Sequence, residues 1–135
     1  MPLLVDTGIL YALADEDDDW HARARNFIQS NRLPLITPVT VVPEVTYLLR
    51  SRLGPNAERI FVESLADGEV VAENLRAADL ARCAALLGEF DFLGFVDASV
   101  VAMAERLGLR SIVTTDRRDF RRVRPRHTSA FELLP

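Results

Sequence analysis

The sequence of 135 residues contains no lysine, so all 16 basic residues are arginine. This absence excludes sites that depend on a lysine amine, such as a phosphate-binding P-loop or a Schiff base. Cys83 is the only cysteine, which excludes an internal disulfide. Leu80, Ala84 and Leu87 surround it at helical spacing, and this pattern predicts that the thiol packs in the core.

Long apolar runs and a targeting pattern are also missing. No segment approaches the roughly 20 apolar residues of a membrane-spanning helix. The start has no basic residue, and Asp6 interrupts its apolar run, which argues against a secretory signal. Hydrophobic residues make up 49% and charged residues 27% of the chain, as in folded soluble proteins. We therefore expect a cytoplasmic protein in which residues 1–135 form one domain.

Charge is segregated along the chain, although the formal net charge is only −4. Acidic residues gather at 15–19, which we interpret as an exposed helix start; a second metal site there is the weaker alternative. Six arginines fall between Arg117 and Arg126. This arginine tract indicates either a phosphate-binding surface or a solvated loop or protein interface, and both interpretations stay open.

Short apolar runs alternate with longer amphipathic segments, which is typical of an α/β fold with a mainly parallel central sheet. Thr37 and Pro38 look like an N-cap followed by proline at the first helical position. Pro43 should kink that helix or delay its start. The predicted strands cover residues 2–5, 35–36, 69–72, 111–114 and, for a short last strand, 129–131. The predicted helices cover about 7–14, 18–30, 38–54, 55–65, 76–88 and 98–107.

Four acids stand where this topology would bring them together. Asp6 and Asp116 follow predicted strands, and ligands of open parallel sheets bind at the carboxyl ends of strands. Glu44 and Asp97 lie near helix starts among apolar residues, where carboxylates are seldom found unpaired. Carboxylates that converge need a cation. Oxygen ligands select Mg²⁺ or Mn²⁺, and such a site suits phosphodiester cleavage.

Each acid also has a simpler explanation when it is taken alone. Asp97 could be an N-cap, Asp6 and Asp116 could be turn residues, and Glu44 could be an exposed helix acid. The coincidence of four acids at one end of the predicted sheet favours a shared site.

Several motifs occur in the order found in a known family. They are Leu4–Leu10 with Asp6, Asp19-Trp20-His21, Thr37–Glu44, Phe95–Ala98 with Asp97, and Val113–Phe120 with Asp116. Taken together, the chain resembles PIN-domain nucleases, and most closely the VapC-type toxins of bacterial toxin–antitoxin pairs. The resemblance implies a three-layer PIN-like (Rossmann-like) fold with helices on both faces of the sheet. It also implies Mg²⁺- or Mn²⁺-dependent endoribonuclease activity.

The resemblance assigns roles to particular residues. It implies that Asp6, Glu44, Asp97 and Asp116 are the catalytic and metal-binding quartet. Thr115 matches a polar residue that orients the site, and Asp119 is a possible accessory acid. The RNA-binding candidates of the tract are Arg117, Arg118 and Arg121. We expect His21 to cap or pack near the first helix and not to take part in catalysis.

The resemblance further implies a homodimer and a small antitoxin that covers the acidic site. Apolar residues of the second and third helices are the candidate contacts, namely Phe27, Ile28, Val45, Leu48 and Leu49.

Two other functions are weighed against this one. An aspartyl-nucleophile phosphatase is disfavoured because Gly8 stands two residues after Asp6, where such enzymes carry a second acid, and because no lysine is available for the phosphoryl group. A non-catalytic PIN-like module that binds RNA or protein is the alternative, but such modules usually lack one of the acids, and all four are present here.

Overall fold

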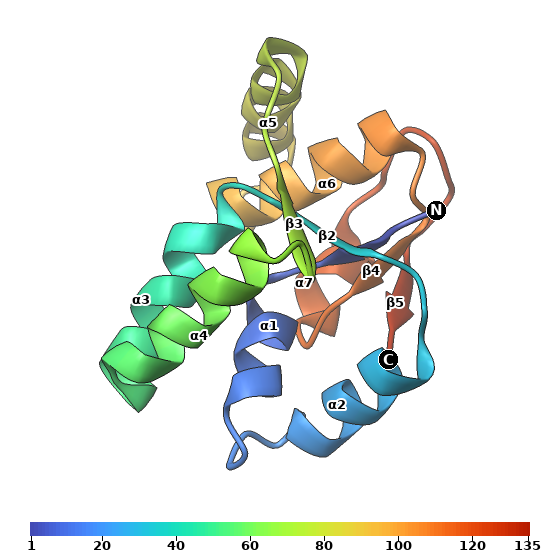
Figure 1. The fold of residues 1–135 in the computed structure, drawn as a ribbon. Coiled ribbons are helices and arrows are strands. Elements are labelled where there is room, and N and C mark those ends of the chain that lie inside the picture. Colours follow the sequence, from blue (N-terminus) through green and yellow to red (C-terminus); the bar gives the residue numbers. More distant parts are fainter.

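Five parallel strands form the centre of the molecule in the spatial order β3-β2-β1-β4-β5 (Figure 1). The computed structural model describes all residues, 1–135. The strands are β1 (Leu3–Val5), β2 (Leu35–Pro38), β3 (Val70–Glu73), β4 (Ser111–Val113) and β5 (Glu132–Leu134). The central strand β1 is completely buried and apolar, as expected for a strand covered on both faces.

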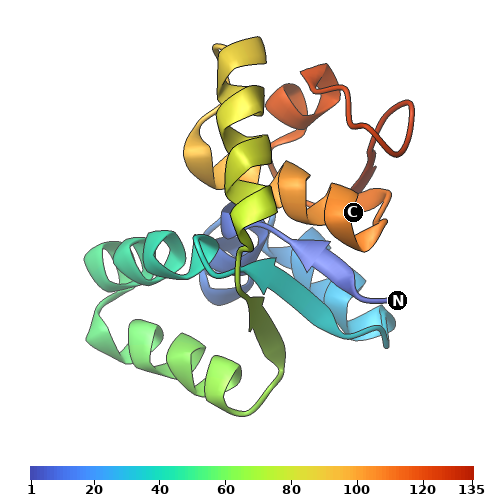
Figure 2. The same cartoon turned by 90° about the horizontal axis from the view of Figure 1, so that it is seen from above.

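Seven helices connect these strands. They are α1 (Thr7–Ala14), α2 (His21–Ser30), α3 (Val41–Leu53), α4 (Pro55–Ala66), α5 (Ala77–Glu89), α6 (Phe95–Leu107) and α7 (Arg117–Arg122). The strand order reverses after β3, so right-handed crossovers put α1–α4 on one face and α5–α7 on the other (Figure 2). The three-layer α/β fold predicted from the sequence is thus confirmed. None of the helices is long and apolar enough to cross a membrane.

The predicted helix start at Thr37 and Pro38 is wrong. Both residues belong to β2, where the Thr37 hydroxyl donates to the carbonyl of Val5 over 2.8 Å. The helix begins at Val41, and Pro43 is its third residue. Because the first-turn N–H groups of a helix have no partner within it, proline removes nothing there. Pro43 therefore marks the true start of α3.

The structure also differs from the sequence prediction at α6, at the last strand and at α7. α6 begins at Phe95, because Gly94 adopts the extended N-cap conformation. The last strand lies at Glu132–Leu134, three residues beyond the predicted position, where it pairs with β4. α7 was not predicted at all, because it is only six residues long and five of these are charged. Its single buried residue, Phe120, anchors it to the core.

The core positions α6 firmly. Seven consecutive residues of this helix, 98–104, are buried, because α5 covers the side that faces away from the sheet. Cys83 of α5 is only 2% exposed, so its predicted core position is confirmed. Two ion pairs lock α5 to α6: Arg82 contacts Glu105 at 2.7 Å, and Arg106 contacts Asp79 at 3.0 Å. The start of α6 is thus a rigid support for Asp97.

Candidate functional site

Asp6 ends the central strand and caps α1. Its Oδ1 accepts from the backbone N–H of Ile9 over 3.2 Å, and its Oδ2 accepts from the Thr114 hydroxyl. The side chain is only 4% exposed. The pKa of Asp6 is raised to about 7. Burial is the largest cause, the two hydrogen bonds oppose the rise, and the charges of Asp97 and Asp116 add to it. Asp6 therefore caps α1, and its carboxyl group lies close to the like charges of Asp97 and Asp116.

Asp97 is the third residue of α6, so the interpretation of this residue as an N-cap is wrong; Gly94 takes that place. Burial, and after it the charges of Asp116, Glu44 and Asp119, together raise the pKa of Asp97 to about 6. Such a carboxyl group lies in an environment that disfavours its ionised form unless a positive charge is near.

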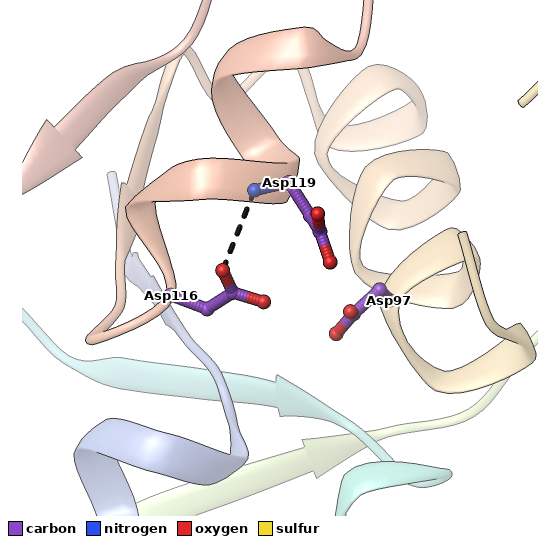
Figure 3. Close-up of side chains that lie close together, drawn as sticks. All are labelled: Asp97, Asp116 and Asp119. Carbon is purple, nitrogen blue, oxygen red and sulfur yellow. Dashed lines mark hydrogen bonds between the residues drawn. The ribbon is translucent and has the colours of Figure 1, made fainter. Parts of the chain in front are cut away.

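Asp97, Asp116 and Asp119 form the tightest acidic group of the molecule. Each offers one carboxylate oxygen, and these oxygens all lie within 4.8 Å of one another. Figure 3 shows the three side chains directed into one space between α6 and the start of α7. Asp116 also caps α7 by accepting from the backbone N–H of Asp119 over 3.4 Å. The donor set is entirely oxygen, which fits a hard divalent cation.

Glu44 lies in the first turn of α3 and is exposed, as its simpler explanation expects. It is not part of the tight group, but its charge raises the pKa of Asp97, so it lies on the same side of the sheet edge. The structure thus brings Asp6, Asp97, Asp116 and Asp119 together and keeps Glu44 at their margin.

The threonine that contacts the acids is Thr114, not Thr115. The fully buried Thr114 hydroxyl donates to Asp6 and accepts from the Asp116 backbone N–H over 2.9 Å. Burial was the signal available in the sequence, because Thr114 continues the apolar run of β4, and a buried hydroxyl needs a partner. Thr115 instead lies against Gly8, where any Cβ would overlap its hydroxyl.

The arginine tract is partly helical, and its members differ in their surroundings. Arg117 is half-buried, donates to the carbonyl of Pro135 and lies over the ring of Trp20 at 5.3 Å. Arg122 lies over Phe92 at 3.8 Å. Arg118 and Arg121 are exposed. Residues 117–122 are thus a helix and not a loop, but three of its four arginines are exposed, so a phosphate-binding surface and a protein interface both stay open.

Two other predictions can be compared with the structure. A ring nitrogen of His21 lies 2.7 Å from the carbonyl of Ala12 in α1, which confirms that this residue packs near the first helix. The acidic run 15–19 lies in the loop between α1 and α2 and not in a helix. Asp15 accepts from the Tyr11 hydroxyl, and Asp18 accepts from the backbone N–H of Trp20, so these two acids order the loop.

The proposed interface residues are partly wrong. Val45 and Leu49 are 0% exposed and face the core, so neither can meet a partner. Phe27, Ile28 and Leu48 are half-buried.

The sheet is parallel, and acidic side chains gather beyond the ends of its strands. These features place the chain in the class of α/β proteins with a site built from carboxylates. The sequence matches the PIN domain over residues 3–125, so the chain belongs to the PIN-domain family. It is 32% identical to Ribonuclease VapC26 of Mycobacterium tuberculosis, over 98% of this chain and all of that protein. Its fold is similar to the crystal structure of Mycobacterium tuberculosis VapC20, described as a Sarcin-Ricin loop cleaving toxin. That match has a TM-score of 0.80 and 24% identity, over 86% of this chain and 91% of the other.

Proposed function

We propose that this protein is a Mg²⁺-dependent endoribonuclease and the toxin of a toxin–antitoxin pair, with residues 1–135 forming a single PIN domain. The observation that carries the proposal is the group of Asp97, Asp116 and Asp119 beside buried Asp6. RNA as the substrate follows from family membership and from the name of the relative VapC26, a ribonuclease.

In this proposal the acids hold the cation. Asp6, Asp97 and Asp116 are the ligands, Glu44 completes the quartet from the exposed margin, and Asp119 is accessory. When held by these acids, Mg²⁺, or Mn²⁺ in its place, would supply a Lewis acid for a phosphoryl oxygen and for the attacking water. The hydroxyl of Thr114 keeps Asp6 oriented toward Asp97 and Asp116. The raised pKa values of Asp6 and Asp97 support a cation site, because a positive charge would relieve the cost of ionising these carboxyls.

Arginines next to the acids would bind the RNA backbone. Arg118 and Arg121 are exposed on α7, which starts directly after Asp116. Arg117 is half-buried and anchored, so we assign it to positioning as much as to contact. Positive side chains on the helix beside an acidic site let the enzyme hold a polyanion although its net charge is negative.

Two protein partners complete the proposal. The antitoxin is proposed to cover the acidic site. An apolar surface that is available to it lies at the opposite end of the strands, where β2 and β3 begin. A pocket of about 440 Å³ is lined mainly by hydrophobic residues of α1, α4 and the adjoining strands. For the homodimer, Leu80 and Leu87 lie exposed on α5. Sedimentation that shows a monomer at micromolar concentration would contradict the dimer.

The test is cleavage of a mixed-sequence RNA with and without Mg²⁺ or Mn²⁺. We expect metal-dependent internal cleavage by the wild-type protein, loss of cleavage with EDTA, and loss in Asp116→Asn. Asp91→Asn is the matched control, because Asp91 is exposed in the loop before α6 and does not belong to the acidic group. RNA binding without cleavage would replace the enzyme by a non-catalytic binding module.

A further inference from the structure

Trp20 is the one tryptophan of the chain, and two guanidinium groups contact its ring. The Cζ of Arg23, on α2, lies 4.4 Å from the ring centroid, and the Cζ of Arg117, on α7, lies 5.3 Å from it. The contacts join helices from opposite faces of the sheet. Arg117 directly follows Asp116 of the acidic group, so its contact with Trp20 connects Trp20 and Arg23 to the start of α7.

Neither of these two arginines forms an ion pair with an Asp or Glu side chain. None of the five ion pairs involves Arg23 or Arg117, although Asp17, Asp18 and Asp19 directly precede Trp20. The carboxylate of Asp18 is instead used by the backbone N–H of Trp20, over 2.8 Å. The Nε of Arg117 is buried and has no hydrogen-bond partner. Two arginines thus contact one aromatic ring, and neither forms an ion pair with an acidic side chain.

Stacking on an aromatic ring fixes a guanidinium plane and leaves the donors at its rim available. Arg117 is half-buried, and its Nη2 donates to the carbonyl of Pro135, so it contributes charge from a fixed position. Arg23 is exposed and has no hydrogen-bond partner apart from solvent, so its donors can reach a ligand. A planar fork of N–H donors matches the oxygens of a phosphate group.

We propose that Arg23, ordered by Trp20 and accompanied by Arg117, is a phosphate-binding residue for the single-stranded RNA backbone flanking the cleavage site. The RNA surface is therefore composite, with α2 contributing beside α7, and is not confined to the arginine tract. This inference rests on the proposed ribonuclease function. Trp20 is a positioning residue in it and does not contact the reacting phosphate.

Arg25 provides a matched control. It lies on the same helix, is exposed, carries the same charge and contacts neither an aromatic ring nor an acid. Two residues along an α-helix correspond to about 200° of rotation, so Arg25 points away from the side on which Arg23 meets Trp20. Replacing either arginine removes one positive charge from α2, so the long-range effect on RNA binding should be similar. Only Arg23 is proposed to contact a phosphate directly.

The experiment measures RNA binding at several salt concentrations in an Asp97→Asn background, so that the RNA stays intact. The probe is a fluorescein-labelled single-stranded RNA of about 12 nucleotides, followed by anisotropy. Arg23→Gln should weaken binding several-fold and lower the slope of log K against log salt by about 0.7, the value of one lost phosphate contact on a single strand. Arg25→Gln should leave both quantities unchanged.

The stacking itself is tested at Trp20. Trp20→Phe retains an aromatic ring and should retain the affinity, whereas Trp20→Leu should weaken binding without any change of charge. Thermal melts show whether the leucine variant folds, and Arg23→Gln, a surface change, decides the proposal if it does not.

Three results would overturn the inference. They are an unchanged salt slope in Arg23→Gln, equal losses in Arg23→Gln and Arg25→Gln, and unchanged RNA binding combined with weaker binding of a polyglutamate peptide. The last result would assign the surface to an acidic protein segment. A parent protein that binds no RNA at any salt concentration would instead refute the proposed function itself.

Discussion

Replacing Asp97 by asparagine separates its role in the site from its role in folding. The change keeps the shape of the side chain at the third position of α6 and removes one negative charge. If Asp97 is a metal ligand, metal-dependent RNA cleavage should fall by orders of magnitude, because the cation loses a charged ligand. The metal-free protein should become more stable, because Asp97 is ionised at neutral pH at a cost.

The size of that cost follows from the raised pKa of Asp97. Its ordinary value is 3.8, and burial with the charges of Asp116, Glu44 and Asp119 raises it to about 6. A shift of two units corresponds to at most about 3 kcal/mol. Solvent screening of the partly exposed carboxyl reduces this to about 1–2 kcal/mol. For a domain of this size the gain in Tm is about 4 °C per kcal/mol.

The pH dependence has a definite sign. The pKa of Asp97 is higher in the folded protein than in the unfolded protein. Ionising Asp97 therefore costs no stability below about pH 4, and the free energy of unfolding falls as the pH rises from about 4 through 6. The gain of Asp97→Asn over wild type should therefore be absent at pH 4 and complete above pH 6. Added Mg²⁺ should reverse the order at neutral pH, by about 2.7 kcal/mol for wild type at a hundredfold excess over Kd.

The assay pairs RNA cleavage with thermal melts of wild type, Asp97→Asn and the exposed control Asp91→Asn, at pH 4 to 8, with EDTA or Mg²⁺. The control should melt and cleave like wild type. Full activity in Asp97→Asn, or an equal Mg²⁺ shift of Tm in both proteins, would refute the reasoning and remove Asp97 from the metal site.

Two further variants test the surroundings of Asp6. Thr114→Val removes the hydroxyl that lowers the pKa of Asp6, so the pH at half-maximal Mg²⁺-dependent cleavage should rise, and an unchanged pH profile would contradict this role. The buried Asp116 N–H also loses its acceptor, which should cost about 1–2 kcal/mol in urea unfolding. Gly8→Ala should destabilise wild type, because its Cβ would overlap the Thr115 hydroxyl. In a Thr115→Ala background the same change should stabilise by up to ~1 kcal/mol, as for alanine in an open helix; destabilisation in both backgrounds would show that the overlap is not the cause.

The order of the strands, and of the acids that follow them, could be predicted because a local sequence pattern marks each strand and each acid. Asp6 ends an apolar run, and parallel topology brings strand ends to one edge. The start of α3 could not be placed this way. Thr37 and Pro38 satisfy the rules for a helix start, but they pair with Ala72 and Glu73 of β3, which extends the strand through them.

The composition of the tight acidic group depends on three-dimensional detail that the sequence hides. Asp119 belongs to it because the short helix α7, anchored by Phe120, turns that side chain toward Asp97. Glu44 is left at the margin, because the first turn of α3 exposes it. Thr114 and Thr115 are adjacent and chemically identical. Only the burial of Thr114 after β4 shows that it is the threonine that contacts Asp6.

The most direct test of the central claim is the location of Mn²⁺ in crystals of the wild-type protein by anomalous scattering. The account predicts a peak in the space between α6 and α7, in direct contact with carboxylate oxygens of Asp97 and Asp116, and no peak there in Asp97→Asn. A peak confined to the acidic loop 15–19, or an empty acidic group at millimolar Mn²⁺, would contradict the account.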